Sequence, residues 1–430
     1  MDKVIKERIG AIKNRCIPSG YCRTKDIGVA PEDWTLGKVS DVVNPIKRAV
    51  PKPDKPYWRL GIKSWAKGTF HAYVDDPETV DMDELYEVHE NDLVVNITFA
   101  WEHAIAIANK DDQGLLVSHR FPTYEFKNGQ VPNFYKAVIT QKFIKDMLDH
   151  ISPGGAGRNR VLNQKDFLNL PCYVPPLAEQ EKISEILDHY DKLIKLCEAK
   201  VDEYKDLKKA CLRKMFPQNG SSVPELRFPG FTDAWEQRKL GDIGTLKNGM
   251  NFSKDAMGHG FPFINLQNIF GKTAIDIQNL GKAKATLAQL KDYSLIKGDV
   301  LFVRSSVKLE GVGEAALVPE TLENTTYSGF IIRFRDEFGL DDSFKRFVFS
   351  TEGVRKQIMS QATDSANKNI SQTVLANMEI KIPGIEEQRT IGAFFRSLDQ
   401  LITLHQCEVE EYTKHKKAIS QLLLTGIVRV

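Results

Sequence analysis

Residues 167–216 read FLNLPCYVPPLAEQEKISEILDHYDKLIKLCEAKVDEYKDLKKACLRKMF, and residues 375–424 repeat them without a gap as LANMEIKIPGIEEQRTIGAFFRSLDQLITLHQCEVEEYTKHKKAISQLLL. In this alignment 15 of the 50 pairs are identical, which chance does not produce. A period of 208 residues is too long for a solenoid, whose repeats span a few tens of residues. The chain therefore carries a duplicated unit.

Each copy predicts a short strand followed by a long helix. Apolar and β-branched residues precede Pro175 and Pro383, which end the strand. Apolar side chains then recur at alternating steps of four and three residues, the spacing of a coiled-coil seam. The seam of the first copy comprises Ile183, Leu187, Tyr190, Ile194, Cys197, Val201 and Tyr204. That of the second comprises Ile391, Phe395, Leu398, Ile402, Val409 and Tyr412, and His405 interrupts it.

A helix from about residue 179 to residue 215 would be roughly 50 Å long. One narrow apolar stripe on such a helix cannot be buried without a partner. The two copies share the same spacing, so we predict that they pair as an antiparallel coiled coil. The alternative is two unrelated surface helices, each packed on its own domain.

The regions ahead of the two helices share a pattern of turns and strands although their sequences have diverged. Glu90-Asn91-Asp92 and Lys297-Gly298-Asp299 each precede an apolar strand. We therefore predict an α+β fold with an internal two-fold pseudo-repeat, in which two mixed α/β domains with small sheets are separated by the two long helices. The predicted segments are an N-terminal segment 1–30, a domain 31–176, a helix 177–216, a linker 217–231, a domain 232–384 and a helix 385–430.

Composition points to a soluble, cytoplasmic protein. The 430 residues include 42% hydrophobic residues, carry a net charge of +2 and contain no apolar run long enough to span a bilayer. The six cysteines show no CxxC spacing, so we expect reduced thiols and no metal site. No catalytic motif is duplicated, which favours a recognition protein without catalytic residues.

Local charge points to nucleic acid. Between residues 44 and 68, seven cations accompany Tyr57, Trp58 and Trp65 against the single acid Asp54. Cations neutralise phosphates and aromatic rings pack on sugars or bases, whereas a solvated basic loop with core tryptophans is the alternative. The candidate DNA-binding residues in the first domain are Lys47, Arg48, Lys52, Arg59, Lys63, Lys67, Arg158 and Arg160.

The second domain offers amides and cations of the kind that bind base edges. A polar segment around Lys368 corresponds to the glycine-rich loop that carries Arg158 and Arg160. The candidate residues in this domain are Lys247, Asn265, Gln267, Asn268, Arg304, Ser305, Lys308 and Lys368.

Four motifs resemble the specificity subunits of type I restriction-modification enzymes, and the resemblance covers nearly the whole chain. They are TKDIGVAPEDW at 24–34, PPLAEQ at 175–180, PELRFPGFTDAW at 224–235 and LTGIVRV at 424–430. The resemblance implies two target recognition domains, each reading one half of a bipartite double-stranded DNA sequence. The Asn91 turn departs from the family's usual Lys-Gly-Asp.

The resemblance also implies that the helices dock two methyltransferase subunits. Because stiff paired helices would fix the distance between the two domains, we also predict that they set the spacer between the half-sites. It places Glu179, Gln180, Glu387 and Gln388 in the region near these partners. With restriction or translocase subunits, the complex would use S-adenosylmethionine, ATP and Mg²⁺, none of them bound by this chain. There are two rival hypotheses. The first is a coiled-coil scaffold whose two variable domains bind proteins, and the second is an enzyme that acts on nucleic acid by itself, without partner subunits.

Overall fold

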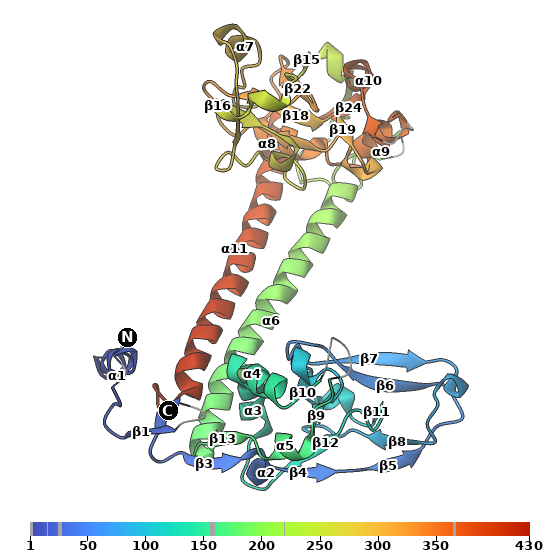
Figure 1. Cartoon of the computed structure of the whole chain (residues 1–430). Coiled ribbons are helices and arrows are strands. Elements are labelled where there is room, and N and C mark those ends of the chain that lie inside the picture. Colours follow the sequence, from blue (N-terminus) through green and yellow to red (C-terminus); the bar gives the residue numbers. More distant parts are fainter. Residues whose placement is uncertain (1–2, 15, 25–27, 155–159, 219, 364–366) are drawn as a thin grey trace. The chain divides into compact units, whose positions relative to one another are not determined.

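The computed structural model describes residues 3–14, 16–24, 28–154, 160–218, 220–363 and 367–430 (Figure 1). By their contacts the residues form two compact units. Unit 1 comprises residues 1–196 with 408–430, and unit 2 comprises residues 197–407. The domain boundaries expected from the sequence stay a prediction, because this division gives each unit a part of both long helices.

A four-stranded antiparallel sheet lies in each unit, and the strand order is the same in both. In unit 1 the order is β10 (Ile105–Ile107), β9 (Leu93–Val95), β12 (Thr123–Phe126) and β4 (Val43–Ile46). In unit 2 it is β20 (Ala315–Leu317), β18 (Val300–Val303), β22 (Ile331–Asp336) and β15 (Gly244–Asn248). Strands β9 and β18 are buried at every position, as expected for a strand covered on both faces. The duplication therefore extends into the diverged regions.

A second sheet differs between the units. In each, an antiparallel hairpin is extended by one parallel strand. Unit 2 has β17 (Gly281–Ala283), β16 (Met257–Ile264) and β21 (Thr326–Tyr327). Unit 1 has five strands: β5 (Ala49–Pro51), β8 (Glu84–Glu87), β11 (Leu116–Val117), β6 (Tyr57–Ile62) and β7 (Thr69–Val74). Strands β5 and β8 are the largest departure of unit 1 from the shared plan.

The turn in front of β9 keeps the geometry of its copy although its sequence differs. Asn91 adopts φ 69° where Gly298 adopts φ 88°. Asparagine tolerates this left-handed conformation better than most residues with a side chain. In both turns the aspartate that follows accepts a backbone hydrogen bond from three residues earlier, at 2.8 Å for Asp92 and 2.9 Å for Asp299. The change from glycine to asparagine therefore leaves the turn intact.

Three short helices follow the sheets in each unit. They are α3 (Pro132–Ile139), α4 (Lys142–His150) and α5 (Gln164–Leu168) in unit 1, and α8 (Asp342–Val348), α9 (Glu352–Ser360) and α10 (Gln372–Asn377) in unit 2. The strand predicted ahead of each long helix is present and pairs with the first strand of its domain. These pairs are β13 (Pro171–Val174) with β3 (Thr35–Lys38), and β24 (Glu379–Ile382) with β14 (Glu236–Lys239).

The two long helices are α6 (Leu177–Lys214) and α11 (Ile385–Leu424). In unit 1 the start of α6 and the end of α11 enter one core, through Ile183, Leu187 and Leu423. In unit 2 the end of α6 and the start of α11 share another, through Cys211 and Phe395. Among the described residues, no helix is long and apolar enough to cross a membrane.

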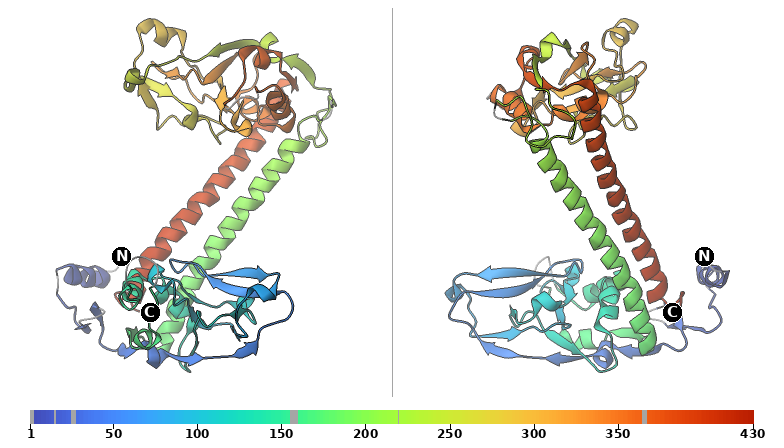
Figure 2. Two further views of the ribbon diagram at one scale, coloured as in Figure 1. Left: turned by 45° about the vertical axis from the view of Figure 1, so that its right-hand side comes forward. Right: turned by 180° about the vertical axis from the view of Figure 1, so that it is seen from behind.

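The helices pair antiparallel, as the repeat predicts (Figures 1 and 2). In unit 1 the ammonium of Lys416 lies 2.5 Å from the carboxylate of Asp191. In unit 2 Lys208 lies 2.5 Å from Asp399. Because Lys208 and Lys416, and likewise Asp191 and Asp399, are equivalent positions 208 residues apart, the same ion pair forms twice with the helices exchanged. A parallel pair would not give this reciprocal pattern.

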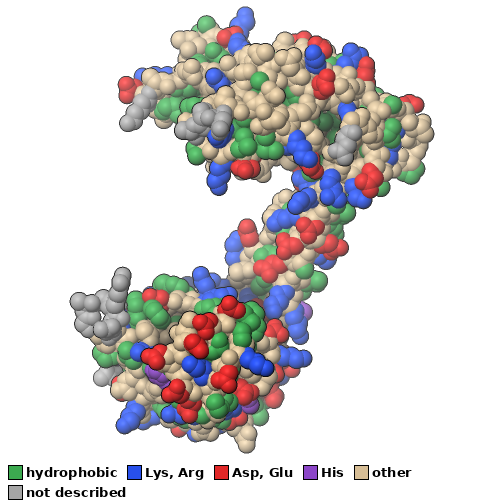
Figure 3. All heavy atoms as spheres, turned by 90° about the vertical axis from the view of Figure 1, so that its right-hand side faces the viewer, with side chains coloured by type: hydrophobic (Ala, Val, Ile, Leu, Met, Phe, Trp, Pro, Cys, Tyr) green, Lys and Arg blue, Asp and Glu red, His purple; other side chains and the backbone are tan. Residues whose placement is uncertain are grey.

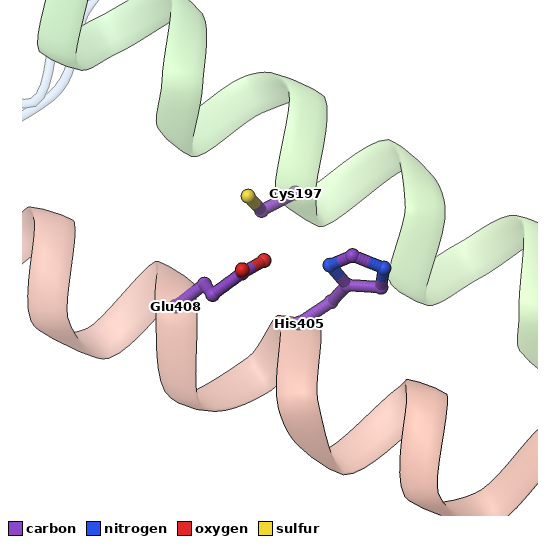
Figure 4. A group of neighbouring side chains, drawn as sticks. All are labelled: Cys197, His405 and Glu408. Atoms are coloured by element: carbon purple, nitrogen blue, oxygen red, sulfur yellow. The ribbon is translucent and has the colours of Figure 1, made fainter.

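His405 does not interrupt the seam, contrary to the prediction. Its ring is 9% exposed and stacks on Tyr204, with the planes 4° apart and the centroids 5.7 Å apart. In unit 2 His405 also faces Cys197, the residue at the same position of the first copy (Figure 4). Glu408 follows one turn along α11 in the same view. A flat ring that stacks on tyrosine fills the seam as an apolar side chain would.

The N-terminal segment comprises α1 (Lys3–Lys13) and a hairpin of β1 (Tyr21–Thr24) and β2 (Gly28–Pro31). It meets the C-terminal residues within unit 1. The Tyr21 hydroxyl donates to the carbonyl oxygen of Gly426 at 2.5 Å, and the Arg8 guanidinium donates to that of Ile427 at 2.9 Å. The two ends of the chain thus complete the same unit.

Candidate nucleic-acid interface

Many of the predicted DNA-binding residues lie around one connection in each unit. Residues 96–104 join β9 to β10 through the 3-10 turn η2 (Ala100–Glu102), and we call this connection edge loop 1. Residues 304–314 join β18 to β20 through η7 (Leu309–Gly311) and form edge loop 2. An equivalent backbone bond holds the base of each loop, from Leu162 to Ile97 at 2.9 Å and from Ile370 to Arg304 at 3.0 Å.

Edge loop 2 forms one side of an open groove of about 550 Å³ in unit 2. Its strand β19 (Ser305–Ser306) pairs with β23 (Lys368–Asn369). The groove is lined by Leu266, Phe270, Ser305, Ser306, Val307, Lys308, Glu310, Gly311, Glu314, Phe330 and Asn367. The predicted residues Ser305 and Lys308 therefore line this groove, and the exposed Gln267 and the strand residue Lys368 are chain neighbours of lining residues.

The other predicted residues of unit 2 have structural roles. Asn268 is 2% exposed and its amide donates to two backbone carbonyls at 3.2 Å, so we remove it from the DNA-contacting set. Asn265 accepts a hydrogen bond from the Leu266 amide at 2.8 Å and caps a 3-10 turn. Lys247 forms an ion pair with Asp292. The half-buried Arg304 donates to the carbonyl oxygen of Gly329 at 3.2 Å and supports the loop from beneath.

In unit 1 the turn between β6 and β7 attaches to edge loop 1. The backbone amide of Trp65 donates to the carbonyl oxygen of Glu102 at 2.9 Å, and that of Ala66 donates to His103 at 2.8 Å. These bonds hold the predicted residues Lys63 and Lys67, both exposed, beside the loop.

Aromatic rings and cations meet at this place. Trp65 is 58% exposed, and the ammonium of Lys145 lies 4.1 Å from the centre of its ring. The guanidinium of Arg160 lies 5.3 Å from the centre of the Trp101 ring, and the neighbouring Phe99 is 46% exposed. Such cation–π pairs hold a positive charge and a flat apolar surface side by side. Both are needed to contact the phosphates and sugars or bases of a nucleic acid.

Several residues of unit 1 that were predicted to bind DNA form hydrogen bonds within the protein instead. Arg48 donates two hydrogen bonds, at 2.5 and 3.2 Å, to Asp92, whose side chain is 3% exposed. Because breaking this pair would leave a buried carboxylate alone, we remove Arg48 from the DNA-contacting set. Lys52 donates to the carbonyl oxygen of Val80 at 2.9 Å, and Arg160 also binds Asp149 at 2.6 Å.

Three predictions for unit 1 remain open. Lys47 is exposed at the turn that precedes β5, and Arg59 is half-buried on β6. Arg158 lies outside the described residues. Sequence reasoning missed Phe99, Trp101 and Lys145, because helix α4 and edge loop 1 are brought to the β6–β7 turn only by long-range packing. The available sequence signal is an interleaving of aromatic and basic residues, and it marks residues 44–68.

The four residues predicted to dock partners are buried. Glu179, Gln180, Glu387 and Gln388 are between 1% and 4% exposed. Both glutamines donate to the carbonyl oxygen five residues earlier at 2.9 Å and accept one backbone amide from the preceding domain. These side chains attach each long helix to its domain. Partner docking at this region stays a prediction, and a partner could reach only the surface around them.

Each buried glutamate binds an arginine from a distant segment of its own unit. In unit 1 Arg429 donates to Glu179 at 2.7 and 2.9 Å and to Asp33 at 2.6 and 3.0 Å. In unit 2 Arg227 donates two 2.7 Å bonds to Glu387. These carboxylates raise the pKa of Arg429, Glu179 first and then Asp33, and Glu387 raises that of Arg227. Arg429 in turn lowers the pKa of the Asp33 carboxyl.

A second apolar stripe lies beside the seam on each long helix. Leu196 is 55% exposed and its copy Leu404 is 52% exposed. Leu193 and its copy Leu401 precede them by three residues and are half-buried. Each unit therefore presents the same pair of leucines on the middle of a helix. Basic, acidic and apolar side chains are interspersed on the face of the molecule seen in Figure 3.

Comparison with known proteins agrees with this geometry. A family model described as the type I restriction modification DNA specificity domain matches residues 31–204 and 232–412. The specificity subunit of the type I restriction enzyme MjaVIII from Methanocaldococcus jannaschii is 23% identical over 415 residues, which cover 93% of this chain and 94% of that relative. That of EcoKI from Escherichia coli is 24% identical over 280 residues, 64% of this chain and 58% of its own.

Solved structures share the fold. A chain from a structural study of assembly and conformational transition in the type I R-M system has a TM-score of 0.57 at 17% identity, over 93% of this chain and 99% of its own. The S subunit of a type I restriction-modification system from M. genitalium has a TM-score of 0.51 at 13% identity, over 92% of this chain and 96% of its own.

Proposed function

Because the chain belongs to the family of type I restriction-modification DNA specificity proteins, we propose that its two units each read one half of a bipartite double-stranded DNA sequence. As a specificity subunit it supplies DNA recognition to a type I complex and is not itself catalytic. A protein-binding scaffold is not favoured. No disulfide joins the six cysteines in the described part of the chain, and the proposed location is the cytoplasm.

One observation carries the two-half-site proposal. The duplication keeps the parts that attach helix to domain, namely the buried glutamate with its arginine and the glutamine with its backbone bonds. It changes the residues of the edge loops themselves, which include Phe99 and Trp101 in unit 1 and Ser305, Ser306, Val307 and Lys308 in unit 2. Two different half-sites require different recognition surfaces, and these can be attached to the helices in the same way.

We further propose that two methyltransferase subunits dock on the exposed leucine pairs, Leu193 with Leu196 and Leu401 with Leu404. The same leucine pair on each of the two units suits two copies of one partner. Apolar side chains at a spacing of three also suit a helix that lies along α6 or α11. Restriction or translocase subunits would join such a complex and bring the ATP chemistry with them.

DNA binding by unit 1 can be tested at the β6–β7 turn. Replacing Lys63 and Lys67 with alanine should weaken DNA binding by the assembled complex. It should also reduce the slope of log K against log salt by about 2, because each phosphate contact contributes roughly 0.9. Fluorescence anisotropy between low and moderate salt measures both effects. The control is Lys209→Ala, an exposed lysine on α6, and an unchanged slope for the double variant would remove this turn from the interface.

Bipartite recognition itself can be tested by single-molecule sequencing of methylated DNA from cells that express the complex. We expect two short half-sites separated by unread bases. The Lys63 and Lys67 variant should reduce methylation without altering the half-site read by unit 2. A single contiguous site would contradict the proposal.

A further inference from the structure

We propose that Val307 of edge loop 2 reads a thymine, through its 5-methyl group, in the half-site recognised by unit 2. This inference rests on the proposed function and names the base feature that one part of the surface selects. Val307 is 78% exposed and lines the groove described above. Its two neighbours in the chain, Ser306 and Lys308, line the same groove.

Hydrogen bonds fix the backbone on both sides of Val307. Ser305 and Ser306 pair with Asn369 and Lys368 across β19 and β23. The amide of Lys308 donates to the Ser306 hydroxyl at 3.2 Å, and the amide of Gly311 donates to the carbonyl oxygen of Lys308 at 3.1 Å. A side chain held in this way loses little freedom when it makes a contact, so exposing an aliphatic group here favours recognition.

An isolated exposed valine would need no explanation, because such residues are common on protein surfaces. Val307 is not isolated. Phe330, 58% exposed, and Phe270, 36% exposed, line the same groove. Lys308 supplies a charge suited to a phosphate. Of the two acids in the lining, Glu314 accepts a hydrogen bond from the Gly271 amide at 2.8 Å and Glu310 is exposed in the middle of η7.

The chemistry of the groove selects the base. Hydroxyls can bond to any base edge, whereas an aliphatic group needs an apolar partner. On the major-groove edge of an unmodified base pair, the thymine methyl is the apolar group. The equivalent connection in unit 1 also exposes an apolar side chain, Phe99 at 46%. Both copies of the duplicated domain therefore place an apolar group at this edge although their sequences differ.

The test uses the complete complex with its methyltransferase partners and a duplex that carries the mapped site. Each thymine of the half-site read by unit 2, on either strand, is replaced in turn by deoxyuridine, which lacks only the 5-methyl group. At one position the dissociation constant should rise about fourfold, the factor for one buried methyl group. For Val307→Ala, thymine and uracil at that position should bind equally.

The matched control is Leu287→Ala. Leu287 is 82% exposed at the start of α7 (Leu287–Asp292) in the same unit and does not line the groove. This variant should keep the wild-type preference for thymine. Because Val307 and Leu287 are both exposed, neither substitution should affect folding.

Three results would overturn the inference while leaving the proposed function intact. They are a unit 2 half-site without an A·T pair, a wild-type complex that does not distinguish thymine from uracil, and a Val307→Ala complex that still does. In each, the wild-type complex would still methylate a bipartite site. Failure of the wild-type complex to methylate any bipartite site would instead contradict the proposed function.

Discussion

At the residue scale, single charges join segments that are far apart in the sequence. Arg429, the penultimate residue, binds Glu179 at the start of α6 and Asp33 between β2 and β3. The indole of Trp34 donates to the same Glu179 carboxylate at 2.9 Å. In unit 2 the arginine that binds the buried glutamate is Arg227, which lies in the segment that joins α6 to the second domain. In unit 1 the equivalent arginine comes from the C-terminal end of the chain.

Arg429→Ala should therefore destabilise unit 1. It leaves the Glu179 carboxylate, 4% exposed, without its charged partner. Breaking a buried pair costs several kcal/mol, and we expect about 2 kcal/mol because Trp34 keeps one hydrogen bond. Urea unfolding measures the loss. The control is Lys414→Ala, whose ion pair with Glu410 is exposed and 3.9 Å long, and an equal effect of both variants would contradict the assignment.

The Asp33 part of this stabilisation has a definite pH dependence. Its folded-state pKa is lowered by Arg429 from the ordinary value of 3.8. The contribution is therefore complete above that value and is lost as the pH falls through the lowered pKa.

At the element scale, each long helix presents a buried seam on one face and exposed leucines on another. The seam pairs α6 with α11, and the reciprocal ion pairs Lys208–Asp399 and Lys416–Asp191 set their register. The exposed leucines lie one residue before seam positions, so they face away from the seam centre and remain available to a partner.

Leu196→Glu and Leu404→Glu should each remove one methyltransferase subunit from the complex. A charge in the middle of an apolar contact loses the burial of the leucine and leaves a carboxylate without a partner. Native mass spectrometry should show complexes with two partner subunits for the wild type and one for either variant. Thr403→Glu, an exposed neighbour of Leu404, is the control. Retention of both subunits by both leucine variants would move docking to another surface.

At the scale of the whole molecule, we propose that the continuous helices α6 and α11 act as a ruler for the spacer. Seven residues extend a helix by about 10.5 Å and keep the phase of the seam. Inserting one heptad into the middle of both helices should lengthen the unread spacer by about three base pairs, at 3.4 Å per pair. Both half-sites should stay the same.

Methylation mapping measures the spacer in this variant. The same seven residues placed after Gly220, in the linker, form the control and should leave the spacer unchanged. An unaltered spacer in the variant with longer helices would contradict the ruler.

The repeat determined the long helices, their antiparallel pairing and the strands before them, because these depend on periodicity and on equivalence of the copies. Periodicity could not show that Glu179 and Gln388 are buried, that Arg48 and Asn268 are committed to internal bonds, or that His405 stacks on Tyr204.

Nor could local sequence place Trp65 beside Lys145, or Val307 beside Phe330 in one groove. Each pair brings together segments that are tens of residues apart in the sequence. The free energy of packing in the tertiary structure decides which polar side chains are used inside the molecule and which are left for a ligand.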